Sequence, residues 1–399
     1  MPFENSGGFD RMWGDLAPVG RDATTGGYRR FAWTATDATL REWFTGEAAR
    51  RGLDVTADRA GNLWAWTADP DAGKPGLVLG SHLDSVPDGG AFDGPLGIVS
   101  AFAALDLLDR ATLRRPVGIA CFADEEGARF GIACAGSRLI TGALDPDRAR
   151  ALTDDDGTTM AEAMARAGVD PGAVGRDDEA LRRIGTFVEL HVEQGRALAD
   201  GDAAVGVGSG IWPHGRWRLD LRGRADHAGT TRLGDRHDPM LELAATVLEA
   251  RAAAERHGAL ATVGKVRVRP NGVNAIPSEV TAWLDARGPL EDEVRAVVQD
   301  VGRAAGTDPV EESWTPATRF SPSLRDRLAR LLGTDASSTP VLATGAGHDA
   351  GILAAAGIPT AMLFVRNPTG VSHSPAEHAE PADCSAGVAA LARAIEALA

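Results

Sequence analysis

The chain has 399 residues, of which 44% are hydrophobic and 24% are charged, and its formal net charge at pH 7 is −15. This length exceeds what one ordinary hydrophobic core holds, so we expect a globular protein of two domains. The acidic balance argues against nucleic acid as a partner. A local arginine can still bind an anionic substrate at short range.

The cysteine content and the apolar runs favour a cytoplasmic location without a membrane partner. Residues 1–5 lack the basic start and the apolar run of a signal peptide. No apolar stretch is long enough to span a bilayer. The three cysteines, Cys121, Cys134 and Cys384, form no paired pattern, and an odd number of widely spaced cysteines is typical of reduced thiols.

Apolar runs and amphipathic segments alternate in the first half of the chain. A helix is expected to begin near residues 36–39. Nearly continuous apolar runs, typical of strands buried on both faces, occur at 76–79, 116–123 and 186–190. A helical segment at 98–108 separates the first two runs, which predicts parallel strands joined by a crossover helix. The charged, alanine-rich segment 145–181 is expected to form surface helices.

The sequence pattern changes at about residue 208. Residues 216–222 alternate between polar and apolar types, as in a strand with one face in water. Further elements are predicted as a helix at 239–256, strands at 261–268 and 279–286, and a helix at 291–304. This succession predicts a two-layer α+β domain with an antiparallel sheet, which we place at 208–322.

The α/β pattern returns at residue 323 and continues to the C-terminus. Helices are predicted at 324–332, 350–356 and 383–398, and short strands at 341–343 and 359–365. The predicted fold class is therefore α/β. Residues 1–207 and 323–399 form a larger domain with a mostly parallel central sheet flanked by helices, and the α+β domain at 208–322 is inserted into it.

Imidazole and carboxylate side chains recur where predicted strands end. His82, His191 and His373 each follow a separate apolar run, although the chain has only nine histidines. Asp93 lies in the loop after His82, and Glu126 follows the second run. Because open α/β sheets bind ligands at the carboxyl ends of their strands, we expect these five side chains to converge. Imidazoles and carboxylates are typical ligands of divalent metal ions.

Five such ligands exceed the number that one tetrahedral catalytic site uses, and a carboxylate can bridge two ions about 3.5–4 Å apart. We therefore predict two divalent ions bridged by Asp93. His82 and His191 complete the first ion's ligands, and Glu126 and His373 complete the second's. The mixed ligand set suits Zn²⁺, Mn²⁺, Co²⁺ or Ni²⁺. The alternative is that His82 is an ordinary loop histidine and that Asp93 caps a turn or helix.

Two further acids lie next to the predicted ligands. Asp84, two residues after His82, is placed to accept a ring N–H of an imidazole and so fix its tautomer, or else it forms a turn. Neighbouring residues that leave a strand point to opposite sides, so Glu125 is expected to face the substrate while Glu126 binds metal. We predict that Glu125 is a general base, the alternative being an acid at a helix start.

Five motifs together resemble one enzyme family. They are GSHLDSVPDGGAFDGPLG at 80–97, DEEGARF at 124–130, ELHVEQG at 189–195, ADHAGTT at 225–231 and VSHSP at 371–375. In order and over nearly the whole chain they resemble the amidase, hydantoinase/carbamoylase family. That family is a branch of the clan of dinuclear metal aminoacylases and carboxypeptidases. The clan's peptidases usually have an acid at the position of His191, so this histidine is similar to the carbamoylase branch.

The resemblance implies an amidohydrolase that cleaves the carbamoyl amide of a small ureido acid and releases ammonia and carbon dioxide. The leading substrate is an N-carbamoyl-L-amino acid, with allantoate as the close alternative and 3-ureidopropionate after it. The resemblance also implies a homodimer formed through the inserted domain, which acts as a lid. Other hypotheses are a dipeptidase or deacylase of the same clan, and a non-catalytic dimeric binding protein.

The resemblance also implies residues that bind the substrate. Gln194 is expected to bind the ureido group, and His227, from a neighbouring subunit, to stabilise the oxyanion. Asn274 and Arg287 resemble a clamp on the substrate carboxylate, for which a guanidinium fork is the best partner. Alternatively, Arg287 pairs with a surface acid and Asn274 belongs to a turn. His348 either lines the pocket or begins a helix.

Overall fold

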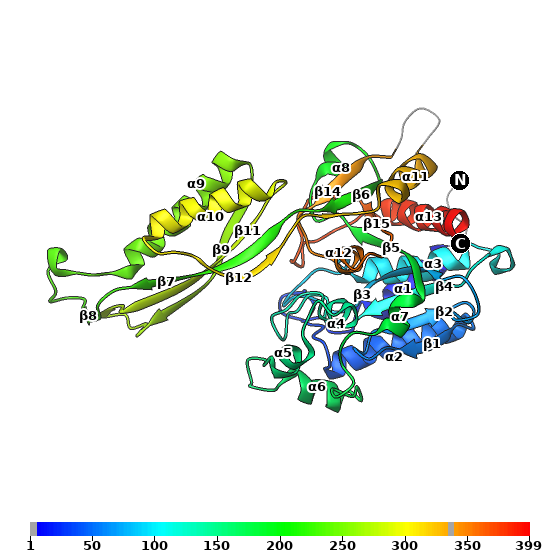
Figure 1. The fold of residues 1–399 in the computed structure, drawn as a ribbon, viewed down its shortest axis with the longest axis horizontal. Helices are drawn as coiled ribbons and strands as arrows, with labels where there is room; N and C mark the ends of the chain where they lie inside the picture. Colours follow the sequence, from blue (N-terminus) through cyan, green and yellow to red (C-terminus); the bar gives the residue numbers. More distant parts are fainter. Residues whose placement is uncertain (1–5, 334–338) are drawn as a thin grey trace. The chain divides into compact units, whose positions relative to one another are not determined.

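The computed structural model describes residues 6–333 and 339–399, and it divides into two compact units. Unit 1 contains the described residues up to Gly210 and from Arg319 onward (Figure 1). Unit 2 spans Ile211–Thr318, which lies inside the range 208–322 expected for the inserted domain. Among the described residues, no helix is both long and apolar enough to cross a membrane.

Unit 1 is built on a nine-stranded sheet of order β1-β2-β4-β3-β5-β15-β6-β13, with β14 beside β6. The strands are β1 Asp54–Ala57, β2 Leu63–Trp66, β3 Gly76–His82, β4 Val117–Phe122, β5 Ile184–Val192, β6 Val205–Ile211, β13 Thr318–Arg319, β14 Val341–Thr344 and β15 Thr360–Val365. The central strands β4, β3, β5 and β15 are parallel. The flanking strands β1, β2 and β6 pair antiparallel. The predicted α/β class is therefore confirmed.

Helices of unit 1 share one apolar core with this sheet. The helices are α1 Ser6–Leu16, α2 Ala35–Arg50, α3 Pro95–Asp106, α4 Ala135–Thr141, α5 Pro146–Ala151, α6 Met160–Arg166, α7 Asp178–Arg182, α8 Ala197–Asp200, α11 Pro322–Leu332, α12 Asp349–Ala355 and α13 Pro381–Leu398. Side chains of α1, α2, α3, α11 and α13 meet alternate strand residues such as Leu77, Leu79 and Leu190 in one cluster. Each fully buried leucine contributes about 1.5–3 kcal/mol to folding.

Helix α3 begins where the chain comes closest to the strand ends. Gly94 precedes it with φ of +84°, a conformation that favours glycine, and a Cβ there would lie 2.5 Å from the ring of His82. Gly97, in its first turn, packs so tightly that a Cβ would overlap the carbonyl oxygen of Leu190 and lie 2.7 Å from Cβ of Ser81. These two glycines let α3 start directly against β3 and β5.

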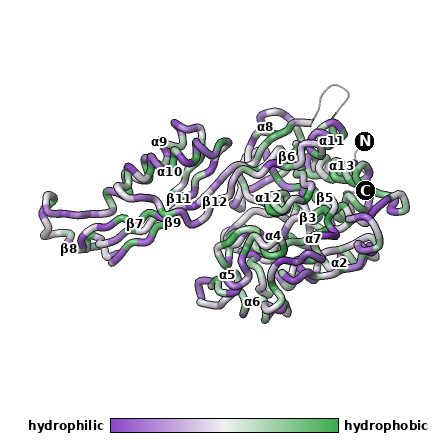
Figure 2. The backbone as a smooth tube through the Cα atoms, viewed as in Figure 1, coloured by the Kyte–Doolittle hydropathy of each residue, from purple (hydrophilic) through white to green (hydrophobic). Residues whose placement is uncertain are grey.

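Unit 2 has two layers, as predicted. Its four-stranded antiparallel sheet has the order β12-β7-β11-β9, and β8 pairs with β10 beside it. The elements are β7 His214–Arg222, β8 Asp226–His227, α9 Pro239–His257, β9 Leu260–Arg269, β10 Ala275–Ile276, β11 Glu279–Arg287, α10 Glu291–Ala305 and β12 Val310–Thr315. Figure 2 shows hydrophobic and hydrophilic residues alternating along β7. The apolar face packs against α9 and α10.

Some elements lie outside the sequence predictions. Strand β6 is rich in glycine, and the edge strand β12 is largely exposed, so neither has the apolar pattern of a buried strand. Helix α4 has only seven residues, too few for a helical period to be recognised. The segment 145–181 contains three short helices separated by turns.

We expect Gly97→Ala to lower the free energy of unfolding by about 1–3 kcal/mol, because the new Cβ displaces the backbone of β5. Gly46→Ala is the matched control, since Gly46 lies in α2 with no atom within 4 Å of an added Cβ. That control should stabilise the protein by about 0.5–1 kcal/mol. Urea unfolding of both variants measures the difference, and equal midpoints would contradict the close packing.

Candidate functional site

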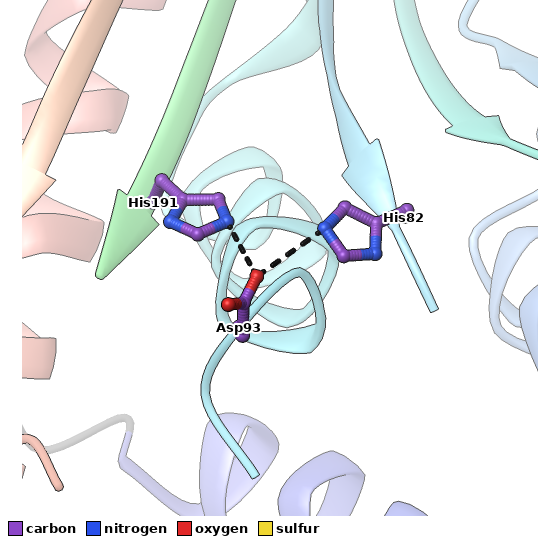
Figure 3. A group of neighbouring side chains, drawn as sticks. All are labelled: His82, Asp93 and His191. Atoms are coloured by element: carbon purple, nitrogen blue, oxygen red, sulfur yellow. Dashed lines mark ion pairs between the residues drawn. The ribbon is translucent and has the colours of Figure 1, made fainter. Parts of the chain in front are cut away.

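Two strands and one loop of unit 1 bring His82, Asp93 and His191 together (Figure 3). His82 ends β3, and His191 lies near the end of the parallel neighbour β5. Asp93 comes from the loop before α3, and its Oδ1 lies 3.1 Å from Nε2 of His191 and 3.5 Å from Nε2 of His82. All three side chains are buried. The three residues can therefore hold one metal ion.

The ring orientations of both histidines fit this purpose. Nδ1 of His82 lies 3.1 Å from the carbonyl oxygen of Asp84, and Nδ1 of His191 lies 2.8 Å from that of Val192. A carbonyl oxygen can only accept, so each Nδ1 carries the proton and each Nε2 presents a lone pair. Both Nε2 atoms are buried without a hydrogen-bond partner among the described residues. Unpartnered imidazole lone pairs beside a buried carboxylate are the donor set that a divalent cation requires.

A second group of possible ligands shares Asp93. Nε2 of His373 lies 3.5 Å from Oδ2 of Asp93 and 3.6 Å from Oε2 of Glu126. These three side chains lie close enough to bind one ion. His373 has φ of +54° and a half-exposed side chain, so this group borders the solvent while the first group is enclosed.

Glu125 lies in the short loop after β4, and Asp84 contacts the backbone of that loop. Oε2 of Glu125 lies 3.7 Å from Nε2 of His82, and Oε1 accepts a hydrogen bond from the thiol of Cys134 at 3.2 Å. The carboxylate of Asp84 accepts the backbone N–H groups of Glu125 and Glu126 at 3.2 and 3.0 Å. Its Oδ1 is 3.4 Å from Nδ1 of His82. Asp84 therefore orients the imidazole mainly through its carbonyl, and its side chain holds the two glutamates.

Three polar residues next to Asp93 complete the surroundings. Nε2 of Gln194 donates to Oδ2 of Asp93 at 2.9 Å and to Oγ of Ser372 at 3.1 Å. The carboxylate of Glu377 accepts the backbone N–H of Asp93 at 2.9 Å. Sequence reasoning missed Ser372 and Glu377. The only signal for them was their position beside His373 in the segment 371–377.

A buried polar layer lies behind His191. Glu189 accepts hydrogen bonds from Oγ of Ser81 at 3.1 Å and from the backbone N–H of Ala350 at 3.1 Å. The ring of His348 contacts that of His191 with centroids 4.5 Å apart, and its Nε2 has no partner among the described residues. His348 is the residue directly before α12, as one of the two roles considered for it from the sequence requires.

The electrostatics of this site follow from its burial. Burial opposes ionisation of Asp93, but positive charge on the imidazoles of His191 and His82 would hold the pKa of that carboxyl well below its usual value, and a bound cation would act in the same direction. Burial raises the pKa of Glu125 well above its usual value, and the acids Asp349, Glu126 and Asp84 act in the same direction. The site thus favours a charged carboxylate at Asp93, and burial makes the carboxylate of Glu125 a stronger proton acceptor than an exposed glutamate.

The remaining predicted residues lie in unit 2, at two different ends of its sheet. His227 of β8 is opposite Ala275, and the backbone N–H of Ala228 donates to the carbonyl of Asn274 at 3.0 Å, so His227 and Asn274 are neighbours. Arg287 ends β11 and holds Asp285 through Nε at 2.8 Å.

The length of β11 separates these two places. The strand runs from Glu279 to Arg287, which corresponds to roughly 26 Å at about 3.3 Å per residue. Asn274 precedes the Glu279 end, and β8 lies beyond that end of the sheet (Figure 1). Asn274 and Arg287 of one chain therefore cannot clamp the same carboxylate.

Known proteins resemble this chain in sequence and in fold. The family model "Peptidase family M20/M25/M40" matches residues 78–397. An N-carbamoyl-L-amino acid amidohydrolase of Geobacillus stearothermophilus is 35% identical over 96% of both chains. The allantoate amidohydrolase of Escherichia coli (strain K12) is 32% identical over 94% of both.

A solved structure agrees with both observations. The crystal structure of a hydantoinase/carbamoylase family amidase from Burkholderia vietnamiensis has a TM-score of 0.87 at 29% identity, over 98% of this chain and 97% of that one. The sequence motifs, the sheet order and the full-length relatives thus agree. The chain belongs to peptidase family M20/M25/M40, in the branch of the hydantoinase/carbamoylase amidases.

Proposed function

We propose that the protein hydrolyses the carbamoyl amide of an N-carbamoyl-L-amino acid, with two divalent metal ions as cofactors. The observation that carries the proposal is the buried group of His82, Asp93 and His191 with Glu125 beside it. A histidine at position 191 supports the carbamoylase branch over the peptidases. Allantoate is the second candidate, because it has a ureido group near a carboxylate and because the relative from Escherichia coli acts on it.

The ligands divide as the geometry allows. His82 and His191 would hold one ion and Glu126 and His373 the other, and Asp93 belongs to both groups of ligands. Bound there, Zn²⁺ or Mn²⁺ (or Co²⁺ or Ni²⁺) supplies Lewis-acid polarisation of the carbonyl and acidifies water. Oε2 of Glu125 faces the same space, while the thiol of Cys134 occupies Oε1.

Glu125 moves the protons of the reaction. Its carboxylate takes a proton from the attacking water and delivers it to the departing nitrogen, so that ammonia leaves uncharged. The carbamate left on the other nitrogen then loses carbon dioxide. Burial of Glu125 favours the first half of this transfer, because a raised pKa makes the carboxylate a stronger acceptor of the proton from water.

Gln194 and residues of unit 2 bind the substrate in this proposal. Gln194 lies beside Asp93 and reaches the ureido group. Arg287 pairs with the substrate carboxylate. His227 and Asn274 act from a partner subunit, because the length of β11 keeps Asn274 away from Arg287 of its own chain.

Two surfaces of unit 2 support a homodimer. Helix α9 exposes Leu241 and Leu248, seven residues apart on one side, with exposed fractions of 72% and 73%. Beside it, β9 is an edge strand of ten residues whose outer edge pairs with no described strand. An apolar stripe next to a long open edge is typical of a surface that a second copy covers.

The thiols are consistent with a cytoplasmic protein. Cys121, Cys134 and Cys384 are all buried and free. Free thiols are typical of reducing compartments.

The metal-loaded protein is expected to release ammonia from N-carbamoyl-L-amino acids faster than from allantoate or 3-ureidopropionate, and to lose this activity on chelation. Ammonia release from this panel, before and after metal is restored, measures both effects. Faster cleavage of dipeptides or N-acetyl amino acids would indicate a peptidase or deacylase instead. No turnover of any amide by protein with bound metal would indicate a binding protein.

Glu125→Gln should lower kcat by about 10²–10⁴-fold, because the amide cannot accept the proton. Metal content should remain at the wild-type value, since Glu125 is no ligand in this proposal. Glu255→Gln, on the exposed surface of α9, is the matched control. Steady-state kinetics and metal analysis of both variants measure these effects. A near-native kcat of Glu125→Gln would contradict the assignment of Glu125 as the general base.

Arg287→Ala should raise KM for carboxylate substrates by about 10- to 100-fold, because charged hydrogen bonds worth about 1.5–3 kcal/mol are lost. The kcat should change less. Arg251→Ala is the control, because Arg251 is an exposed arginine of α9 that pairs only locally with Glu255. Initial-rate kinetics test this expectation, and an unchanged KM would contradict a carboxylate clamp at Arg287.

A further inference from the structure

The carboxylate of Glu377 joins two distant parts of the chain. Its Oε1 accepts the backbone N–H groups of Phe92 and Asp93, each at 2.9 Å, across 284 residues in the case of Asp93. The side chain is buried, with 5% of the residue exposed. Two backbone donors on one buried carboxylate oxygen fix the loop that carries Asp93 more firmly than a surface contact would.

The other oxygen of Glu377 contacts its own segment of the chain, close to His373. Oε2 lies 3.3 Å from Oγ of Ser372, and the same hydroxyl lies 3.3 Å from Oδ2 of Asp93. Ser372 directly precedes His373. Gln194 donates to both Ser372 and Asp93. One carboxylate therefore contacts the loop of Asp93 and the segment of His373 at once.

The loop is shaped to admit this carboxylate. A Cβ at Gly90 would overlap the side chain of Glu377, because it would lie 2.6 Å from Cδ of that glutamate. Gly90 lies only three residues before Asp93. Glycine at this position thus gives Glu377 its close approach to the loop.

We propose that Glu377 is a positioning residue that holds Asp93 and His373 in register for the second metal ion. The proposal rests on the two-ion site of the proposed function. His82 and His191 are fixed by buried strands, whereas His373 lies in a half-exposed loop. Loss of Glu377 therefore affects the ion at Glu126 and His373 more than the ion at His82 and His191.

Glu377→Ala should weaken binding of the second ion by about 10- to 100-fold and leave the first within about 3-fold, as for other residues that orient metal ligands. Glu377→Gln should restore binding, because its amide oxygen can accept both N–H groups and its NH₂ can donate to Ser372. Glu380→Ala is the matched control, since this exposed glutamate lies three residues further on and its side chain pairs with His378 alone among the residues that the structure describes.

The measurement is a calorimetric titration of the chelator-treated full-length proteins with Mn²⁺ alone, repeated with Zn²⁺. Two ions bound equally tightly by Glu377→Ala and wild type would overturn the proposal. So would equal losses in the Ala and Gln variants. Wild-type protein that binds fewer than two ions would instead overturn the two-ion site, so the two failures are distinguishable.

Thermal unfolding of the metal-free protein shows whether Glu377→Ala folds. If it does not fold, a second variant tests the proposal. Gly90→Ala retains the glutamate but displaces its carboxylate from the loop. It should show the same selective loss of the second ion. Unchanged binding in Gly90→Ala would overturn the proposal.

Discussion

The buried carboxylate of Asp93 between two imidazoles is the interaction on which the site depends. A charged carboxylate away from water is costly unless its charge is compensated. Here Gln194 donates to Oδ2 of Asp93, and a cation held with Nε2 of His82 and Nε2 of His191 would compensate the charge at Oδ1. That arrangement exists because β3 and β5 are parallel neighbours whose carboxyl ends meet at one edge. Gly94 adds the remaining condition, since any side chain there would occupy the place of the His82 ring.

The sequence was sufficient to predict the sheet of unit 1 where strands are buried on both faces. β3, β4 and β15 are buried throughout, so their composition alone separates them from helices and loops. In unit 2, α10 has buried valines at 294, 297, 298 and 301, a helical period that the sequence displays directly. The histidines at strand ends could be predicted to form one site, because the carboxyl ends of parallel strands meet at the same edge of a sheet.

What the sequence could not predict depends on contacts between loops. Glu377 meets Asp93 through backbone N–H groups, and such a contact requires only a carboxylate at the right place. Nothing in the residue types around it distinguishes it from exposed glutamates such as Glu380. For a related reason, the sequence could not show that Asn274 and Arg287 of one chain lie too far apart to clamp the same carboxylate. Both residue types suit a carboxylate, but only the length of β11 shows their separation.

The position of β15 in the sheet bears on how the chain is made. This strand lies between β5 and β6, yet it follows both of them and all of unit 2 in the sequence. During synthesis, β5 can pair with β3 but leaves the ribosome long before its second parallel neighbour, β15, exists, and the edge that β15 will cover is a template for wrong pairing. That edge stays open until residues 360–365 have been made, so the strand order exposes the growing chain to aggregation for the whole interval in which unit 2 is synthesised.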